Sequence, residues 1–263
     1  MHLTLHERHA LVCGASQGIG LAAAIELAEL GANVTLLARS ADKLATAAAS
    51  LPRIHATQHH DWRSVDMLDT AQLQTTAAAI VSAQPVHILI NNTGGPPAGT
   101  AQTATIDAFE TAFRQHLLAN QTLLQALLPA MRASGYGRIV NVISTSVKEP
   151  IAGLGVSNTV RAAVASWAKT LASELAADGI TVNNVLPGYT RTRRLDSLLA
   201  TRAAATGRTV DDIAAGILAD VPAGRFGEAG EIASVIAFLC TPAAAYVNGV
   251  SIAVDGGRTR ALS

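Results

Sequence analysis

Three glycines, Gly14, Gly18 and Gly20, follow a short apolar run from Ala10 to Cys13 near the start of the chain. An Ala- and Leu-rich segment from Leu21 to Leu30 comes next, so the pattern predicts a strand, a glycine turn and a helix. Glycine permits the backbone angles of a tight turn, and its missing Cβ lets a phosphate group approach the chain. The free amides and the positive end of the following helix would then favour the anion. The spacing therefore indicates a phosphate-binding loop, although it differs from the common G-x-G-x-x-G pattern.

A second candidate is Arg39, which directly follows the apolar run from Asn33 to Ala38. In a dinucleotide-binding fold, the tip of the second strand meets the adenosine ribose. A carboxylate there bonds the 2′-hydroxyl of NAD, whereas a basic residue accommodates the 2′-phosphate of NADP. This tip carries no carboxylate, and a planar guanidinium matches a phosphate. Arg39 therefore favours NADP(H) over NAD(H), and the alternative is an arginine that is only solvated.

Polar side chains also follow three later apolar runs. The carboxyl ends of parallel strands are where ligands bind in open α/β sheets, so we expect these side chains at one binding edge. A helical region from Ile106 to Met131 carries His116 and Asn120 one turn apart. The runs and the segments after them are Val86 to Ile90 with Asn91 to Gly94, Arg138 to Ile143 with Ser144 to Ser146, and Ile180 to Leu186 with Pro187 to Thr192.

The elements that position these residues alternate between strand and helix along the whole chain. Helices are predicted from Ser157 to Ala177 and from Glu231 to Leu239, and a last strand from Val250 to Val254. Such alternation predicts an α/β fold, with one doubly wound parallel sheet and helices on both faces. We see no linker or internal repeat, so residues 1–263 are interpreted as a single domain. Residues 190–225 are polar, Ala-rich and partly helical, which makes them a candidate substrate lid.

Composition excludes several classes of function. The 263 residues are 49% apolar and 14% charged, with zero formal net charge, so no basic field is available for nucleic acid. No signal peptide and no uninterrupted apolar stretch of about 18 residues is recognised, so we expect a cytoplasmic protein without a membrane span. Cys13 and Cys240 are interpreted as buried thiols of a reducing compartment. Residues 53–65 hold three histidines, but no ligand spacing supports a metal site, and a surface loop or edge segment is expected.

Further motifs occur in a fixed order along the chain. Together with the glycine loop, they make the chain resemble the short-chain dehydrogenase/reductase family, and within that family the 3-oxoacyl-acyl-carrier-protein reductases. The resemblance runs from about residue 8 to residue 258. Cys13 stands where threonine is usual, and Thr93 stands where alanine is usual. The matching motifs are Gly14-x-x-x-Gly18-x-Gly20, Asn91-Asn92-Thr93-Gly94, Pro187-Gly188, Gly224-Arg225-Phe226-Gly227 with Glu231-Ile232-Ala233, and Val254-Asp255-Gly256-Gly257.

The resemblance implies a single Rossmann-like domain that forms a homodimer or homotetramer. It also implies hydride transfer between a nicotinamide and the carbonyl or alcohol carbon of a small molecule. Carried over residue by residue, the family's pattern assigns cofactor contacts to the glycine loop, the tips of several strands and one helix residue. These residues are Gly14, Ser16, Gln17, Gly18, Ile19, Gly20, Arg39, Asp66, Met67, Asn92, Thr93, Gly94, Arg161, Pro187, Gly188, Thr190 and Thr192.

The catalytic positions depart from the family's pattern. The family uses a serine, a tyrosine that passes a proton to the carbonyl oxygen, a lysine one turn later and a supporting asparagine. Ser144 matches the serine, but the tyrosine and lysine positions hold Ser157 and Arg161, and the asparagine position holds His116. A serine hydroxyl is a far weaker acid than a phenol. Arginine stays protonated, so it can bind a ribose but cannot shuttle a proton.

Three interpretations stay open. The chain is a reductase with a different proton donor, an NADP(H)-binding protein without turnover, or a lyase or isomerase that uses the same pocket. For the first, His116 would titrate near neutral pH, and Lys148 would serve if its pKa were lowered. Tyr189 carries a chemically suitable phenol, and water held by Ser144 and Ser157 is a further source.

Overall fold

A computed structural model describes residues 1–262 and contains one seven-stranded sheet in the order β3-β2-β1-β4-β5-β6-β7. Every neighbouring pair of strands is parallel. The order reverses between β1 and β4, which is the point where doubly wound folds bind ligands. The strands are β1 His9–Cys13, β2 Asn33–Ala38, β3 His60–Ser64, β4 Ile88–Asn91, β5 Gly137–Val142, β6 Ile180–Pro187 and β7 Ser251–Val254.

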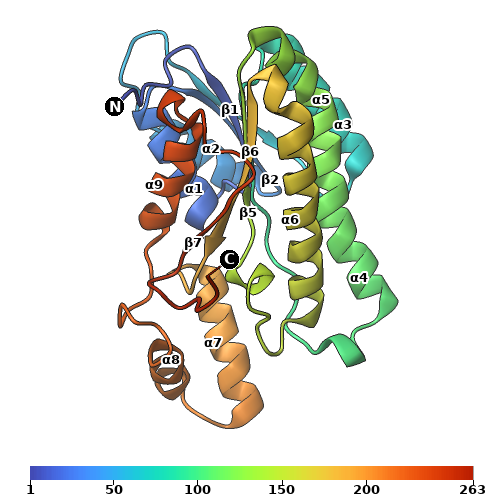
Figure 1. The fold of residues 1–263 in the computed structure, drawn as a ribbon, viewed down its shortest axis with the longest axis vertical. Helices are drawn as coiled ribbons and strands as arrows, with labels where there is room; N and C mark the ends of the chain where they lie inside the picture. The colour runs from blue at the N-terminus through green and yellow to red at the C-terminus, as the bar shows by residue number, and fades with distance from the viewer. Residues whose placement is uncertain (263) are drawn as a thin grey trace.

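Helices cover both faces of the sheet, as predicted (Figure 1). α1, α2 and α9 lie on one face, whereas α3 to α6 lie on the other. α7 and α8 extend beyond the end of the sheet. The bounds are α1 Gly18–Glu29, α2 Ala41–Ser50, α3 Thr70–Ala83, α4 Ile106–Phe113, α5 Ala119–Ser134, α6 Gly155–Leu175, α7 Arg193–Thr206, α8 Val210–Leu218 and α9 Ala229–Cys240.

Two apolar clusters fill the space between the sheet and its helices. The first joins α1, α2 and α9 to one face of the strands, and the second joins α3, α5 and α6 to the other. Leu11 and Val12 of β1 point into opposite clusters and are fully buried. A parallel strand buried on both faces needs such a continuous apolar run, which is why the strands could be recognised. Cys13 and Cys240 are buried free thiols, as predicted.

A row of polar side chains crosses this apolar sheet. Asn91, Asn141, Asn184 and Ser251 occupy paired positions on β4, β5, β6 and β7. Asn91 Nδ2 donates to Asn141 Oδ1 at 2.9 Å, and Asn141 Nδ2 donates to Asn184 Oδ1 at 3.0 Å. Asn184 Nδ2 then donates to the hydroxyl of Ser251 at 3.0 Å. We call these four residues the amide ladder. Because buried amides are costly without partners, the ladder helps to fix the alignment of the four strands.

The structure shifts several predicted boundaries. The first helix begins at Gly18 rather than Leu21, because the glycine turn runs directly into the helix. The helical region predicted from Ile106 to Met131 is helical throughout, but it is not one regular α-helix. A π-helical turn, Arg114–Leu118, interrupts it and separates α4 from α5. A π-turn inserts one residue into the helical repeat and leaves no signature in apolar spacing. The segment 53–65 supplies the edge strand β3, and two of its histidines, His55 and His60, hydrogen-bond carbonyl oxygens.

No helix among residues 1–262 combines the length and the apolar character that a membrane span requires.

Candidate functional site

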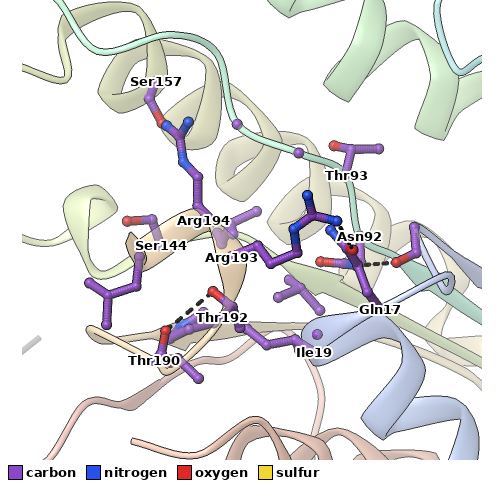
Figure 2. Close-up of a pocket in the computed structure, with 18 of the residues that line it drawn as sticks. Gln17, Ile19, Asn92, Thr93, Ser144, Ser157, Thr190, Thr192, Arg193 and Arg194 are labelled. Carbon is purple, nitrogen blue, oxygen red and sulfur yellow. Dashed lines mark hydrogen bonds between the residues drawn. The ribbon is translucent and has the colours of Figure 1, made fainter. Parts of the chain in front are cut away.

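A cleft of about 800 Å³ lies at the carboxyl ends of the strands around the reversal point. It contains all of the predicted cofactor residues except Gly20, and it also contains the predicted catalytic residues Ser144, Ser157 and Arg161. His116 does not line it. Figure 2 shows that side chains from the glycine loop, from the segments after β4, β5 and β6, and from α6 and α7 point into this one space. The topology therefore gathers residues that lie far apart in the sequence.

The glycine loop is held against Asn92 by contacts that leave no room for a side chain. Gly14 and Gly18 both have φ near +60°, a conformation that favours glycine. A Cβ on Gly14 would overlap with the main-chain oxygen of Asn92, and a Cβ on Gly20 would overlap with the oxygen of Gly14. The side-chain Nδ2 of Asn92 donates to the carbonyl oxygens of Cys13 and Gly14, both at 3.3 Å. Gly20 thus packs against the loop without lining the cleft, and its lack of a side chain allows the loop to adopt this conformation.

The first turn of α1 faces the same cleft. Its N-cap residue is Gln17, whose side chain makes no capping hydrogen bond to the helix. The main-chain amides of the first turn therefore keep their donors for another acceptor, and the helix dipole places positive potential there. An anion is the ligand that such an end favours.

The adenosine end of the cleft is basic. Arg39 is exposed at the tip of β2, and Ser40 and Lys43 line the cleft beside it. Neither Arg39 nor Lys43 takes part in an ion pair within residues 1–262. Sequence reasoning missed Lys43, although its position one turn after Arg39 at the start of α2 is a usable signal.

Two serines define the other end of the cleft. Ser144 follows β5 and its Oγ accepts a hydrogen bond from the amide of Ser146 at 3.1 Å. That bond orients the oxygen and leaves the hydroxyl proton of Ser144 free to donate to a ligand. Ser157 lies in the first turn of α6 and is mostly buried. Both hydroxyls line the cleft.

Arg161 lies one turn after Ser157 and joins the ends of two strands. Its Nη1 donates to the carbonyl oxygen of Val142 at 2.7 Å, and its Nη2 donates to that of Thr93 at 3.3 Å. Only 8% of its surface is exposed. Its buried Nε has no hydrogen-bond partner within residues 1–262. Burial, helped by the positive charge of Arg194, lowers the pKa of Arg161 to about 10, so the group still carries its charge at neutral pH.

His116 lies behind Thr93, in the π-helical turn. Its Nδ1 and the hydroxyl of Thr93 are 2.5 Å apart, whereas its Nε2 is buried without a partner within residues 1–262. Burial lowers the pKa of His116 to about 2, and the charge of Arg161 contributes to this shift. The expectation that His116 titrates near neutral pH is therefore wrong. A neutral imidazole that is shielded from the cleft by Thr93 is a poor proton donor to a ligand.

The two other proposed donors differ in their placement. Tyr189 lines the cleft, and the guanidinium of Arg258 lies 5.3 Å from the centre of its ring. Lys148 does not line the cleft. Among the candidates raised by the sequence, Tyr189, Ser144 and Ser157 are thus the hydroxyl groups that a ligand in the cleft can reach.

Residues from the candidate lid close one side of the cleft. Arg193 donates to the side-chain oxygen of Gln17 at 3.3 Å, and Arg194 donates to the carbonyl oxygen of Pro96 at 2.8 Å. α7 is thereby tied to the glycine loop and to the segment after β4 (Figure 2). Leu195 and Leu198 of α7 add apolar surface to the cleft. Apolar spacing could not foresee these bonds, because they depend on how α7 folds back.

No group of three or more His, Cys, Asp or Glu side chains within residues 1–262 could hold a metal ion.

Comparisons with known proteins agree with this architecture. The profile of the family described as short chain dehydrogenase matches residues 8–203. A 3-oxoacyl-[acyl-carrier-protein] reductase FabG of Vibrio harveyi is 32% identical, over 97% of this chain and 98% of its own length. The NADPH-dependent reductase BacG of Bacillus subtilis is 29% identical, over 98% of this chain and 100% of its own length. The crystal structure of L-sorbose reductase from Gluconobacter frateurii, complexed with NADPH and L-sorbose, superposes with a TM-score of 0.92 at 29% identity, and all of both chains is covered.

Proposed function

Because the chain belongs to the short-chain dehydrogenase family, we propose that it is an NADP(H)-dependent oxidoreductase that interconverts a small carbonyl compound and its alcohol. One observation carries this proposal. One end of a single cleft holds the glycine loop, which favours an anion, and Arg39, which forms no ion pair within residues 1–262. The other end of the same cleft holds the hydroxyls of Ser144 and Ser157. Relatives and structural neighbours described as NADPH-dependent or as binding NADPH support the choice of cofactor.

The cleft fits a phosphorylated dinucleotide. The amides of the first turn of α1 lack a side-chain cap, and the loop from Gly14 to Gly20 allows close approach of the backbone. Arg39 and Lys43 would hold the 2′-phosphate, since neither is occupied by a carboxylate within residues 1–262. The segment Pro187 to Thr192 would hold the nicotinamide end, as the family resemblance implies. Each of these placements is part of the proposal.

The residues near the serine end set the chemistry. Bound NADPH supplies the hydride. The free hydroxyl proton of Ser144 is oriented to donate a hydrogen bond to the carbonyl oxygen of the substrate, which polarises it. Ser157 adds a second hydroxyl, and the buried charge of Arg161 stabilises negative charge that develops on that oxygen. The proton comes from the phenol of Tyr189 or from water held by the two serines, which makes the proton donor non-standard for the family.

The first test is NADPH oxidation over a broad panel of aldehydes and ketones. We expect the native chain to consume NADPH only when a carbonyl compound is present, and Ser144→Ala to lower kcat by about 100-fold by removing one donor to the developing oxyanion. The Kd for NADPH, measured by fluorescence, should change little in this variant. Full activity of Ser144→Ala would remove Ser144 from the mechanism.

The choice of cofactor rests on Arg39. We expect Arg39→Ala to weaken NADPH binding by about 10- to 100-fold, because a charge-assisted contact to the phosphate is lost. NADH lacks that phosphate, so its binding should be unchanged. Arg53→Ala, an exposed arginine that does not line the cleft, is the matched control. Equal loss for the two cofactors, or tighter binding of NADH by the native chain, would contradict the role of Arg39.

A second candidate function is NADP(H) binding without turnover, for example as a sensor or a partner subunit. The replacement of the family's tyrosine and lysine by Ser157 and Arg161 favours it. The double variant Ser157→Tyr, Arg161→Lys separates the two functions on the same carbonyl panel. Turnover by the native chain supports the reductase, whereas turnover by the double variant alone supports the binding protein. A cytoplasmic homodimer or homotetramer stays a prediction from the resemblance.

A further inference from the structure

Two guanidinium groups approach the same point in the cleft. A methyl group built on Gly95 would lie 3.4 Å from Nη2 of Arg194 and 3.7 Å from Nη2 of Arg161. Arg161 comes from α6 and Arg194 from α7, so the fold itself brings the two charges together. The two like charges repel each other, as the lowering of the Arg161 pKa by Arg194 indicates, and such repulsion is strongest where water is excluded.

No carboxylate among residues 1–262 forms an ion pair with either arginine. The hydrogen-bond partners of both groups within residues 1–262 are main-chain carbonyl oxygens, those of Val142 and Thr93 for Arg161 and that of Pro96 for Arg194. The ion pairs in the same part of the chain do not include either arginine. A buried cation without a counter-charge is costly. The buried Nε of Arg161 also has no partner there.

The neighbouring arginines are engaged elsewhere. Arg191 forms an ion pair with Glu228 at 3.0 Å, and Arg193 donates to Gln17 on the glycine loop. Figure 2 shows Arg193 extending toward Gln17 and Asn92, whereas Arg194 points toward Ser157. The pair formed by Arg161 and Arg194 therefore belongs to the serine end of the cleft, away from the loop that we propose for the cofactor phosphates. An anion held by this pair would therefore belong to the substrate rather than to the cofactor phosphates.

The surroundings restrict the class of anion. Ile143, Ile151, Leu154 and Leu198 line the cleft, and they favour a ligand with an apolar body. A guanidinium presents a planar fork of donors that matches the two oxygens of a carboxylate. We propose that Arg161 and Arg194 bind a carboxylate, and that the substrate is a short apolar oxo acid or hydroxy acid. This inference rests on the proposed function, because it names the substrate class of the same site.

The kinetic test compares oxo acids with their methyl esters, which keep the carbonyl and lose the charge. The pairs are 2-oxobutanoate, 3-oxobutanoate and 4-oxopentanoate with their esters, each reduced with NADPH. We expect the native chain to prefer at least one acid over its ester by 10-fold or more in kcat/KM. Arg194→Gln should raise KM for that acid by about 10- to 100-fold and leave KM for the ester and the Kd for NADPH within 2-fold. Arg202→Gln, two turns later on α7 and outside the cleft, should behave as the native chain.

A binding measurement separates failure of this inference from failure of the proposed function. Oxamate is an unreactive carboxylate, and calorimetry on the NADPH-loaded protein measures its affinity without any turnover. Oxamate binding that Arg194→Gln weakens supports the carboxylate site even if no carbonyl compound is reduced. Equal binding by the native chain and by Arg194→Gln, a native preference for the esters, or tighter binding of inorganic phosphate than of oxamate would each overturn the assignment.

Discussion

Gly14→Ala is expected to abolish cofactor binding and to destabilise the protein even without cofactor. The new Cβ would overlap with the main-chain oxygen of Asn92 and would lie 2.8 Å from its Nδ2. Neither group can move easily, because Asn92 directly follows β4 and donates to the loop in return. The variant also places a side chain at φ +60°. We expect a loss of about 2–5 kcal/mol in the free energy of unfolding, from strain and overpacking together.

The effect on the cofactor follows from the same overlap. The loop must move away from Asn92, and the amides of the first turn of α1 move with it. We expect the affinity for NADPH to fall by about 100-fold or more, which corresponds to about 2.7 kcal/mol. Denaturant unfolding of the cofactor-free protein and NADPH fluorescence titration measure the two effects separately.

Gly135→Ala is the matched control for backbone strain. Gly135 caps α5 with φ +59°, and a Cβ there would meet nothing within 4 Å. This variant carries the same conformational penalty without the overlap, so we expect a loss of about 1–2 kcal/mol and unchanged NADPH binding. If Gly14→Ala is no less stable than Gly135→Ala and binds NADPH normally, the tight packing of the loop on Asn92 is not required.

The sequence foretold the parts of the site that lie at strand ends. The strands that end at the glycine loop, Arg39, Asn92 and Ser144 are largely apolar, so these four positions follow from where the apolar runs stop. The doubly wound order then places the ends around the reversal point at one cleft.

The sequence could not foretell how the unusual residues contact one another. Thr93, His116 and Arg161 stand at positions where the family resemblance implies other residues, and the structure joins them. Thr93 contacts the imidazole through its hydroxyl and the guanidinium through its carbonyl oxygen. The charge of Arg161 also contributes to the low pKa of His116. Sequence spacing located each of these residues separately. The low pKa of His116 depends on its burial, and that burial follows from the packing of α6 against the π-helical turn.

The two serines and the buried arginine also differ from a tyrosine and a lysine in the chemistry that they can supply. A phenol combined with a lysine donates a proton and binds a ribose, whereas Ser157 and Arg161 offer a weak acid beside a permanent charge. Under the proposed function, stabilisation of negative charge becomes the main contribution of these positions, and another group supplies the proton. The same permanent charge is what a carboxylate substrate would require, so one substitution supports both the chemistry and the substrate class proposed above.

The amide ladder yields the second large effect. Asn141→Ala removes the central residue, which both accepts from Asn91 and donates to Asn184. All three amides are buried, and Asn141 is fully so, so water cannot replace the lost partners. Each orphaned polar group costs about 1–3 kcal/mol, and we expect a total loss of about 2–5 kcal/mol in the free energy of unfolding. The midpoint of thermal unfolding should fall by about 2–4 °C for each kcal/mol in a chain of this size.

Ser251→Ala is the matched control at the outer end of the ladder. Ser251 accepts from Asn184, but it is only half-buried on the edge strand β7, so water can take its place. We therefore expect a loss below about 1 kcal/mol, as for other accessible hydrogen bonds. Because β5 delivers Ser144, Asn141→Ala should also lower turnover in protein that is still folded, whereas Ser251→Ala should not. Equal stability of the two variants would mean that apolar packing alone aligns the strands, and that the ladder is not what positions the serine end of the cleft.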